Sequence, residues 1–182
     1  CGGVLPCVQV RLAAEQSHAH SQHNLASVYD TDNKREMGVR KDDAEAAKWY
    51  AKAAAQGFVF AQCSLGGLYS DGRGVQQDHA EAVKWLRLAA AKGNAPSQCN
   101  LGVCYKDGEG VLEDPTEAVK WYRLAAAQGD AQAQADLAGL LNDGVGGTGV
   151  VSEDRAEAKR LRRLAKAQEK ESDAYSRALI HI

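Results

Sequence analysis

Two features are missing from this 182-residue sequence, and each absence narrows the range of functions. No apolar run approaches the ~20 residues that a helix needs to cross a bilayer. Neither sign of charge is in large excess, because 22 basic and 24 acidic residues leave a formal net charge of −2. This balance gives no electrostatic reason to expect nucleic acid or an anionic membrane as a general partner.

The number and spacing of the cysteines argue against a disulfide framework. The sequence has five cysteines, an odd number, and no two of them form a CxxC pair. Small proteins stapled by disulfides usually carry an even number of cysteines in a regular pattern. We therefore expect reduced thiols and a reducing compartment, such as the cytoplasm or an organelle interior. The five residues are Cys1, Cys7, Cys63, Cys99 and Cys104.

What the sequence does contain is a repeat with a period of 36 residues. Trp49, Trp85 and Trp121 are equally spaced, and glycines and leucines recur with the same period. Such a period indicates one supersecondary unit copied along the chain, and copies of this kind stack into a solenoid. We expect the tryptophans to lie in the core between repeats. The predicted array spans 1–182, with repeats at 21–57, 61–93, 97–129 and 133–169 and a partial repeat or N-terminal cap at 6–17.

The first part of each repeat predicts a helix with one apolar face. In the second repeat Ala61, Leu65 and Leu68 recur at helical spacing. Gly66 and Gly102 lie on or beside this face, although a glycine inside a helix costs ~1 kcal/mol relative to alanine. Because glycine has no Cβ, we expect a neighbouring helix to approach closely at both positions.

A glycine-rich turn and a second helix complete each repeat. Residues 71–75 read DGRGV, and the two glycines supply the positive φ angles that end a helix and reverse the chain. No strand precedes this turn and no P-loop lysine follows it, so a phosphate-binding loop is not predicted. Each second helix should begin with a capping box, an aspartate followed three residues later by a glutamate. The four boxes are Asp42 with Glu45, Asp78 with Glu81, Asp114 with Glu117 and Asp154 with Glu157.

The recurring residues resemble the Sel-one-like repeat, a relative of the tetratricopeptide repeat. The pattern is A-x-x-x-L-G-x-x-Y-x-x-G-x-G-V-x-x-D-x-x-E-A-x-K-W-x-x-x-A-A-x-x-G, and residues 61–129 match it at nearly every position. The outer repeats depart from it, with Ala26 and Ala138 at the helix glycine, Leu161 at the tryptophan and four extra residues in each turn. The resemblance implies an all-α, right-handed α-solenoid of helix-turn-helix repeats that serves as a scaffold or adaptor without catalytic machinery.

By analogy with the tetratricopeptide family, the resemblance also implies a partner-binding groove on the concave surface formed by the first helices. The groove would hold an extended peptide or a helix of a protein partner. We expect it to be lined by His23, Ser27, Cys63, Gly67, Cys99, Val103, Lys106, Ala135, Gly139 and Asn142, with Asp30, Ser70, Asp71, Asp107 and Asp143 along its edge.

The C-terminal residues suggest a second interpretation. Residues 155–182 contain neither glycine nor proline, so we predict one helix of about 40 Å at ~1.5 Å per residue. Its first half is basic, which suits the solvated cap that the end of a solenoid needs. The alternative function is that of a structural subunit, which docks through this helix on an acidic partner within a larger assembly. Protein is favoured over RNA as that partner. The docking residues would be Arg160, Arg163, Lys166, Tyr175 and Leu179.

Residues that often carry out chemistry are present, but their pattern does not indicate a catalytic or metal site. His18, His20 and His23 form an H-x-H-x-x-H cluster, yet no neighbouring Cys, Asp or Glu completes a ligand set. Cys63 and Cys99 occupy one repeat position, so they should form a column with His23, neighbours lying about 8–10 Å apart. A nucleophile needs a base within hydrogen-bond reach. We therefore predict no catalytic residue, metal or cofactor, and a hydrolase is the least favoured function.

Overall fold

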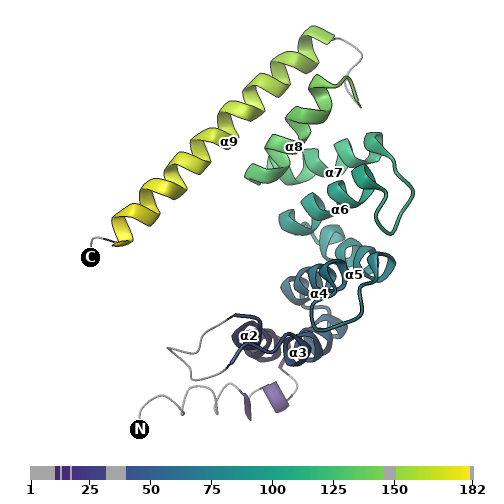
Figure 1. Cartoon of the computed structure of the whole chain (residues 1–182), viewed down its shortest axis with the longest axis vertical. Helices are drawn as coiled ribbons and strands as arrows, with labels where there is room; N and C mark the ends of the chain where they lie inside the picture. The colour runs from purple at the N-terminus through teal and green to yellow at the C-terminus, as the bar shows by residue number, and fades with distance from the viewer. Residues whose placement is uncertain (1–10, 13, 17, 32–39, 146–150, 181–182) are drawn as a thin grey trace. The chain divides into compact units, whose positions relative to one another are not determined.

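Helices make up all the regular secondary structure in the described part of the chain (Figure 1). The computed structural model describes every residue except 1–10, 13, 17, 32–39, 146–150 and 181–182, and for 151–153 and 175–180 it describes the backbone alone. The helices are α2 (Ala19–Asp30), α3 (Asp43–Ala55), α4 (Val59–Asp71), α5 (His79–Ala91), α6 (Ala95–Asp107), α7 (Pro115–Ala127), α8 (Ala131–Asn142) and α9 (Val151–Ile180).

The helices divide between two compact units. Unit 1 is Cys1–Asn94 with helices α2 to α5, and unit 2 is Ala95–Ile182 with helices α6 to α9. Within each unit, every helix packs on the one that follows it in sequence. Each repeat therefore contributes a first helix (α2, α4, α6 or α8) and a second helix (α3, α5, α7 or α9). This pairing confirms the predicted all-α repeat architecture with its long final helix.

Three of the four predicted capping aspartates begin a second helix. In each, the side chain accepts a hydrogen bond from the backbone N–H of the glutamate three residues on, at 2.9–3.0 Å. The glutamate carboxylate in turn pairs with a lysine one turn into the helix. The pairs are Asp42–Glu45, Asp78–Glu81 and Asp114–Glu117.

The fourth capping prediction is wrong. Helix α9 already begins at Val151, so Asp154 lies inside the helix, where it is 6% exposed. The reason is local, because residues 151–153 contain no glycine or proline that would stop the helix from starting earlier. The helix therefore extends further towards the N-terminus than the predicted start at residue 155.

The two helix glycines are sites of close helix contact, as predicted. A Cβ on Gly66 would lie 2.8 Å from Cγ of Leu86, and a Cβ on Gly102 would lie 2.6 Å from ring carbons of Tyr122. Both facing side chains are buried, with Leu86 at 2% and Tyr122 at 0% exposure. Glycine therefore lets the second helix of the same repeat approach the first one closely.

The tryptophans are less central than the sequence suggests. Trp49 is buried, but Trp85 and Trp121 are only half-buried, so the core prediction holds for the first alone. Neighbouring positions on a helix point about 100° apart. When the next residue faces the first helix of its own repeat, the tryptophan is turned to the margin of the core. The residues that directly follow the three tryptophans are more deeply buried, at 3, 2 and 0% exposure for Tyr50, Leu86 and Tyr122.

Candidate partner-binding surfaces

The four groove residues predicted in unit 1 all keep part of their surface in solvent. His23 and Ser27 lie on α2, and Cys63 and Gly67 lie on α4. A Cβ on Gly67 would meet no atom within 4 Å, so the backbone there borders open space. The first helices of unit 1 thus present an accessible surface of mostly small side chains, called here the first-helix surface of unit 1.

An aromatic cluster that the sequence analysis missed lies on this surface. The ring centroid of His23 lies 5.1 Å from that of Phe58 and 5.4 Å from that of Tyr50, and the Phe58 and Phe60 centroids are 5.8 Å apart. Phe60 is 60% exposed. His20 contacts Phe58 edge-on. Composition held a signal for this cluster, because its two phenylalanines are the only ones in the chain.

Packing among these rings changes the acidity of His23. Burial lowers the pKa of His23 below its ordinary 6.5, a hydrogen bond with Asn24 opposes this, and the nearby His20 lowers it further. His23 is therefore neutral at pH 7. Its ring contributes to the aromatic cluster as an uncharged group.

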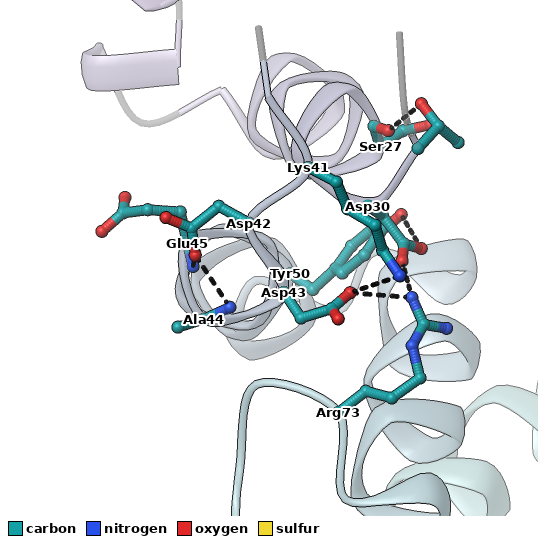
Figure 2. A network of polar contacts seen from close by, with 10 residues as sticks. Ser27, Asp30, Lys41, Asp42, Asp43, Ala44, Glu45, Tyr50 and Arg73 are labelled. Atoms are coloured by element: carbon teal, nitrogen blue, oxygen red, sulfur yellow. Dashed lines mark hydrogen bonds and ion pairs between the residues drawn. The ribbon is translucent and has the colours of Figure 1, made fainter. Parts of the chain in front are cut away.

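Beside this surface, Arg73 joins two acidic residues of the first repeat (Figure 2). Nη2 of Arg73 donates to Oδ1 of Asp43 at 2.9 Å and also pairs with Asp30. The Tyr50 hydroxyl donates to Asp30 at 3.4 Å. The hydrogen bond from Arg73 holds the pKa of Asp43 below its usual 3.8. Asp30, predicted at the edge of the groove, is thus neutralised by an ion pair.

The glycine-rich turn brings Arg73 to this position. Gly72 and Gly74, on either side of it, have φ angles of 68° and 70°, which confirms the predicted role of these glycines. A Cβ on Gly74 would lie 2.0 Å from the carbonyl oxygen of Asp43, so the turn of the second repeat packs directly on the start of α3. Arg73 and Asp30 are 43 residues apart in sequence, and no local pattern indicates their pairing.

In unit 2 the predicted groove residues differ in exposure. Ala135 and Asn142 on α8 are exposed, and Val103 and Lys106 on α6 are half-buried. Gly139 also borders open space, because a Cβ there would meet no atom within 4 Å. The predicted edge residues of unit 2, Asp107 and Asp143, are exposed; of those in unit 1, Ser70 is half-buried and Asp71 is exposed.

Cys99 does not lie on an open surface. It is 4% exposed and belongs to the core cluster that contains Tyr122 and Leu137. Burial, with the charges of Asp130 and Asp136, raises the pKa of its thiol to about 12. Cys63 holds the same repeat position and is half-exposed, so burial here depends on the neighbouring helices. Cys63, Cys99 and Cys104 are not joined by disulfide bonds, and Cys1 and Cys7 lie outside the described residues.

The histidine cluster shows no metal-binding arrangement. Among the described residues, no group of three or more His, Cys, Asp or Glu side chains is placed to hold a metal ion. His18 and His20 are exposed, and His23 contacts aromatic rings. The contacts of His23 therefore place it in a packing cluster.

Helix α9 packs on α8 through its first half and extends well past it (Figure 1). Ala158 and Ala165 are buried, whereas every side chain from 169 to 174 is exposed. The predicted docking residues Arg160, Arg163 and Lys166 are exposed. The side chains of two others, Tyr175 and Leu179, lie outside the described ones. Across the described residues, no helix has the length and apolar character of a membrane span.

The repeat pattern agrees with a family model. The Sel1 repeat model matches residues 19–58, 59–94, 95–130 and 131–169. This chain belongs to the Sel1 repeat family. Proteins with Sel1 repeats typically serve as scaffolds for protein–protein interactions, which makes that general role the expectation for this Sel1 repeat protein.

Solved Sel1-type structures share its fold. The protective antigen c5321 of uropathogenic Escherichia coli is 38% identical, with a TM-score of 0.80 over 89% of this chain and 33% of its own. A Sel1 repeat protein from Oxalobacter formigenes is 32% identical, with a TM-score of 0.79 over 90% of this chain and 62% of its own. This Sel1 repeat chain thus spans less than two thirds of either structure. Helicobacter pylori cysteine rich protein B, at 19% identity and a TM-score of 0.54, shares the fold alone. No curated protein matches significantly.

Proposed function

We propose that this Sel1 repeat protein is a non-catalytic scaffold that binds a peptide or helix of a protein partner on its first-helix surfaces. The aromatic cluster of unit 1 is the observation that carries the proposal. Phe60 leaves 60% of its surface in solvent, beside half-buried Phe58 and His23. Exposed aromatic groups that are already held in place by their neighbours are typical anchors of protein interfaces.

The residues around the cluster suit the backbone of a partner. Ser27, Cys63 and Gly67 have small side chains or none, and Gly67 borders open space. A bound peptide or helix could therefore approach α2 and α4 closely while its apolar side chains pack against Phe58 and Phe60. The neutral state of His23 removes the cost of covering a charge at this point.

The chemistry of the candidate nucleophiles supports a role without catalysis. A cysteine acts as a nucleophile in its thiolate form, and a raised pKa of about 12 keeps Cys99 protonated. The equivalent position of the first repeat holds His23, whose ring contacts are aromatic. These observations favour binding over hydrolysis.

The test is affinity purification with mass spectrometry on the wild type and on two matched variants. Phe60→Ser removes the exposed anchor and should lose the partners, while the melting temperature stays close to that of the wild type. Leu112→Ser is the control, because it removes an even more exposed apolar side chain, at 90%, from the turn before α7. Equal recovery of partners by Phe60→Ser and the wild type would contradict the proposal.

Docking through α9 is the second candidate, favoured by the exposed residues 169–174 beyond the packed part of the helix. Arg160, Arg163 and Lys166 would provide the positive charge for an acidic partner. A chain that ends at residue 170 keeps Ala158 and Ala165, the buried contacts of α9, and removes the region of Tyr175 and Leu179. Loss of partners from this truncated chain, together with their retention by Phe60→Ser, would favour the helix over the first-helix surface.

A further inference from the structure

Unit 2 contains a second candidate site, a pocket of about 550 Å³ between α7, α8 and α9, called here the terminal pocket. None of the residues proposed for the first-helix surfaces lines it. Its apolar wall includes Leu161 and Leu164, and Leu164 is 43% exposed. Its polar groups come from Arg123, Gln134, Glu157 and Arg160.

The position of Leu161 in the repeat suggests what the pocket can hold. Leu161 stands where the three preceding repeats have Trp49, Trp85 and Trp121. Leucine is smaller than tryptophan, so the last repeat does not fill this position with an indole of its own. A pocket also lies beside Trp49 in the first repeat, so the leucine does not by itself create the terminal pocket; it leaves an aliphatic wall, against which a bulky apolar side chain supplied from outside can pack.

A buried amide at the pocket wall lacks one hydrogen-bond partner. In the first and third repeats, Oε1 of the equivalent glutamine accepts at 2.7 Å from the glutamine that caps the second helix, as Gln22 does from Gln56 and Gln98 from Gln128. In the second repeat, Oε1 of Gln62 has no partner, and the last repeat is alike in this respect. Gln134 is 3% exposed; its Nε2 donates to the carbonyl of Ala126 at 3.4 Å, but its Oε1 has no partner. An unpaired buried acceptor is costly. A ligand with an N–H donor would relieve that cost.

The charges at the rim favour an acidic ligand. Glu157 is already paired with Arg123, at 3.3 Å between Oε2 and Nη2. Arg160 lies exposed at the rim, next to exposed Lys159 and one turn before exposed Arg163 on α9. The surroundings of the pocket are therefore cationic, and complementary charge steers acidic segments towards it.

We propose that the terminal pocket binds a tryptophan side chain of an acidic partner peptide. Leu161 and Leu164 contact the indole ring, and the indole N–H donates to Oε1 of Gln134. Arg160 pairs with acidic residues next to the tryptophan, and its guanidinium is also suited to stack on the ring. The proposal does not rest on the proposed function of the first-helix surfaces.

The experiment uses the full chain and a fluorescein-labelled peptide, Glu-Asp-Trp-Glu-Asp, with binding followed by fluorescence anisotropy. Two comparison peptides replace either the tryptophan by alanine or the four acidic residues by lysine. The parent peptide should bind at least about tenfold more tightly than either. A third peptide with naphthylalanine removes only the N–H group and should bind several-fold more weakly. Absence of binding by the parent peptide, or equal binding of the alanine peptide, would overturn the proposal.

Two substitutions test the location of the site. Leu161→Trp installs the residue of the other repeats and should fill the pocket, so that binding weakens by at least about tenfold without loss of the folded state. Arg160→Glu should also weaken binding by about tenfold, whereas Arg162→Glu makes the same charge change on an exposed residue of α9 outside the pocket lining. Unchanged binding by Leu161→Trp, or equal effects of the two arginine substitutions, would refute the assignment.

Discussion

Substitution of two adjacent glycines in α4 gives the sharpest test of how the repeats pack. Gly66 and Gly67 share a helix, a sequence neighbourhood and a helical backbone. Alanine at either position should gain ~1 kcal/mol of helix propensity. At Gly66, however, the new Cβ would lie 2.8 and 2.9 Å from two carbons of Leu86 and 3.3 Å from the carbonyl oxygen of Ala82. At Gly67 it would meet no atom within 4 Å.

The magnitude follows from the overlap. Carbon atoms in contact prefer separations of ~3.5–4.0 Å, so the methyl group at position 66 requires Leu86 to move by several tenths of an ångström. Leu86 is 2% exposed and has little room to do so. Overpacking of this kind costs ~1–3 kcal/mol. Because the propensity gain is common to both variants, Gly66→Ala should be less stable than Gly67→Ala by ~1–3 kcal/mol.

The assay is urea unfolding followed by far-ultraviolet circular dichroism, with the wild type, both single variants and Gly66→Ala combined with Leu86→Ala. Gly67→Ala should raise the midpoint and Gly66→Ala should not. In the combined variant the added methyl group lies in space that Leu86 has vacated, so the double change should be less harmful than the sum of the two single changes. Equal stabilisation by both glycine substitutions, with no coupling to Leu86, would refute the close-contact argument.

Three further predictions concern other features. Trp85→Ala should lower the unfolding free energy by about 2–3 kcal/mol in urea melts. This is less than the ~3–5 kcal/mol typical of a fully buried tryptophan, because Trp85 is half-buried. A loss below about 1 kcal/mol would place Trp85 on the surface. Arg73→Ala should cost roughly 1 kcal/mol at neutral pH, since its ion pairs are partly exposed. The pKa of Asp43 is lower in the folded than in the unfolded state, so this stabilisation is present above pH 3.8 and is lost as the pH falls through the folded value. If the difference in unfolding free energy between the wild type and Arg73→Ala stays constant as the pH falls below 3.8, the pairing of Arg73 with Asp43 is contradicted. For His23, the lowered folded pKa means that the unfolded state binds the proton more readily, so the melting temperature should fall as the pH drops below 6.5. His23→Phe should flatten that dependence, and an identical profile for both proteins would exclude His23 as its source.

Local chemistry alone determined the repeat architecture of this chain. The capping aspartates and the paired glycines act on a few neighbouring residues, and their geometry hardly depends on the rest of the molecule. The 36-residue period shows that this local pattern is copied along the chain. Asp78 bonds to the backbone of Glu81, and Gly72 and Gly74 adopt positive φ angles, as the sequence predicts. The close contact at Gly66 was also predictable, because a glycine on the apolar face of a helix has few other uses.

Tertiary structure decided which of these positions are available to a partner. Cys63 and Cys99 occupy the same repeat position, yet one is half-exposed and the other is buried in the core beside Tyr122. The pairing of Arg73 with Asp30 joins residues 43 positions apart. A repeat pattern specifies which way a side chain points from its own helix. Its exposure depends on what the neighbouring helices place against it, and that arrangement exists only once the chain has folded.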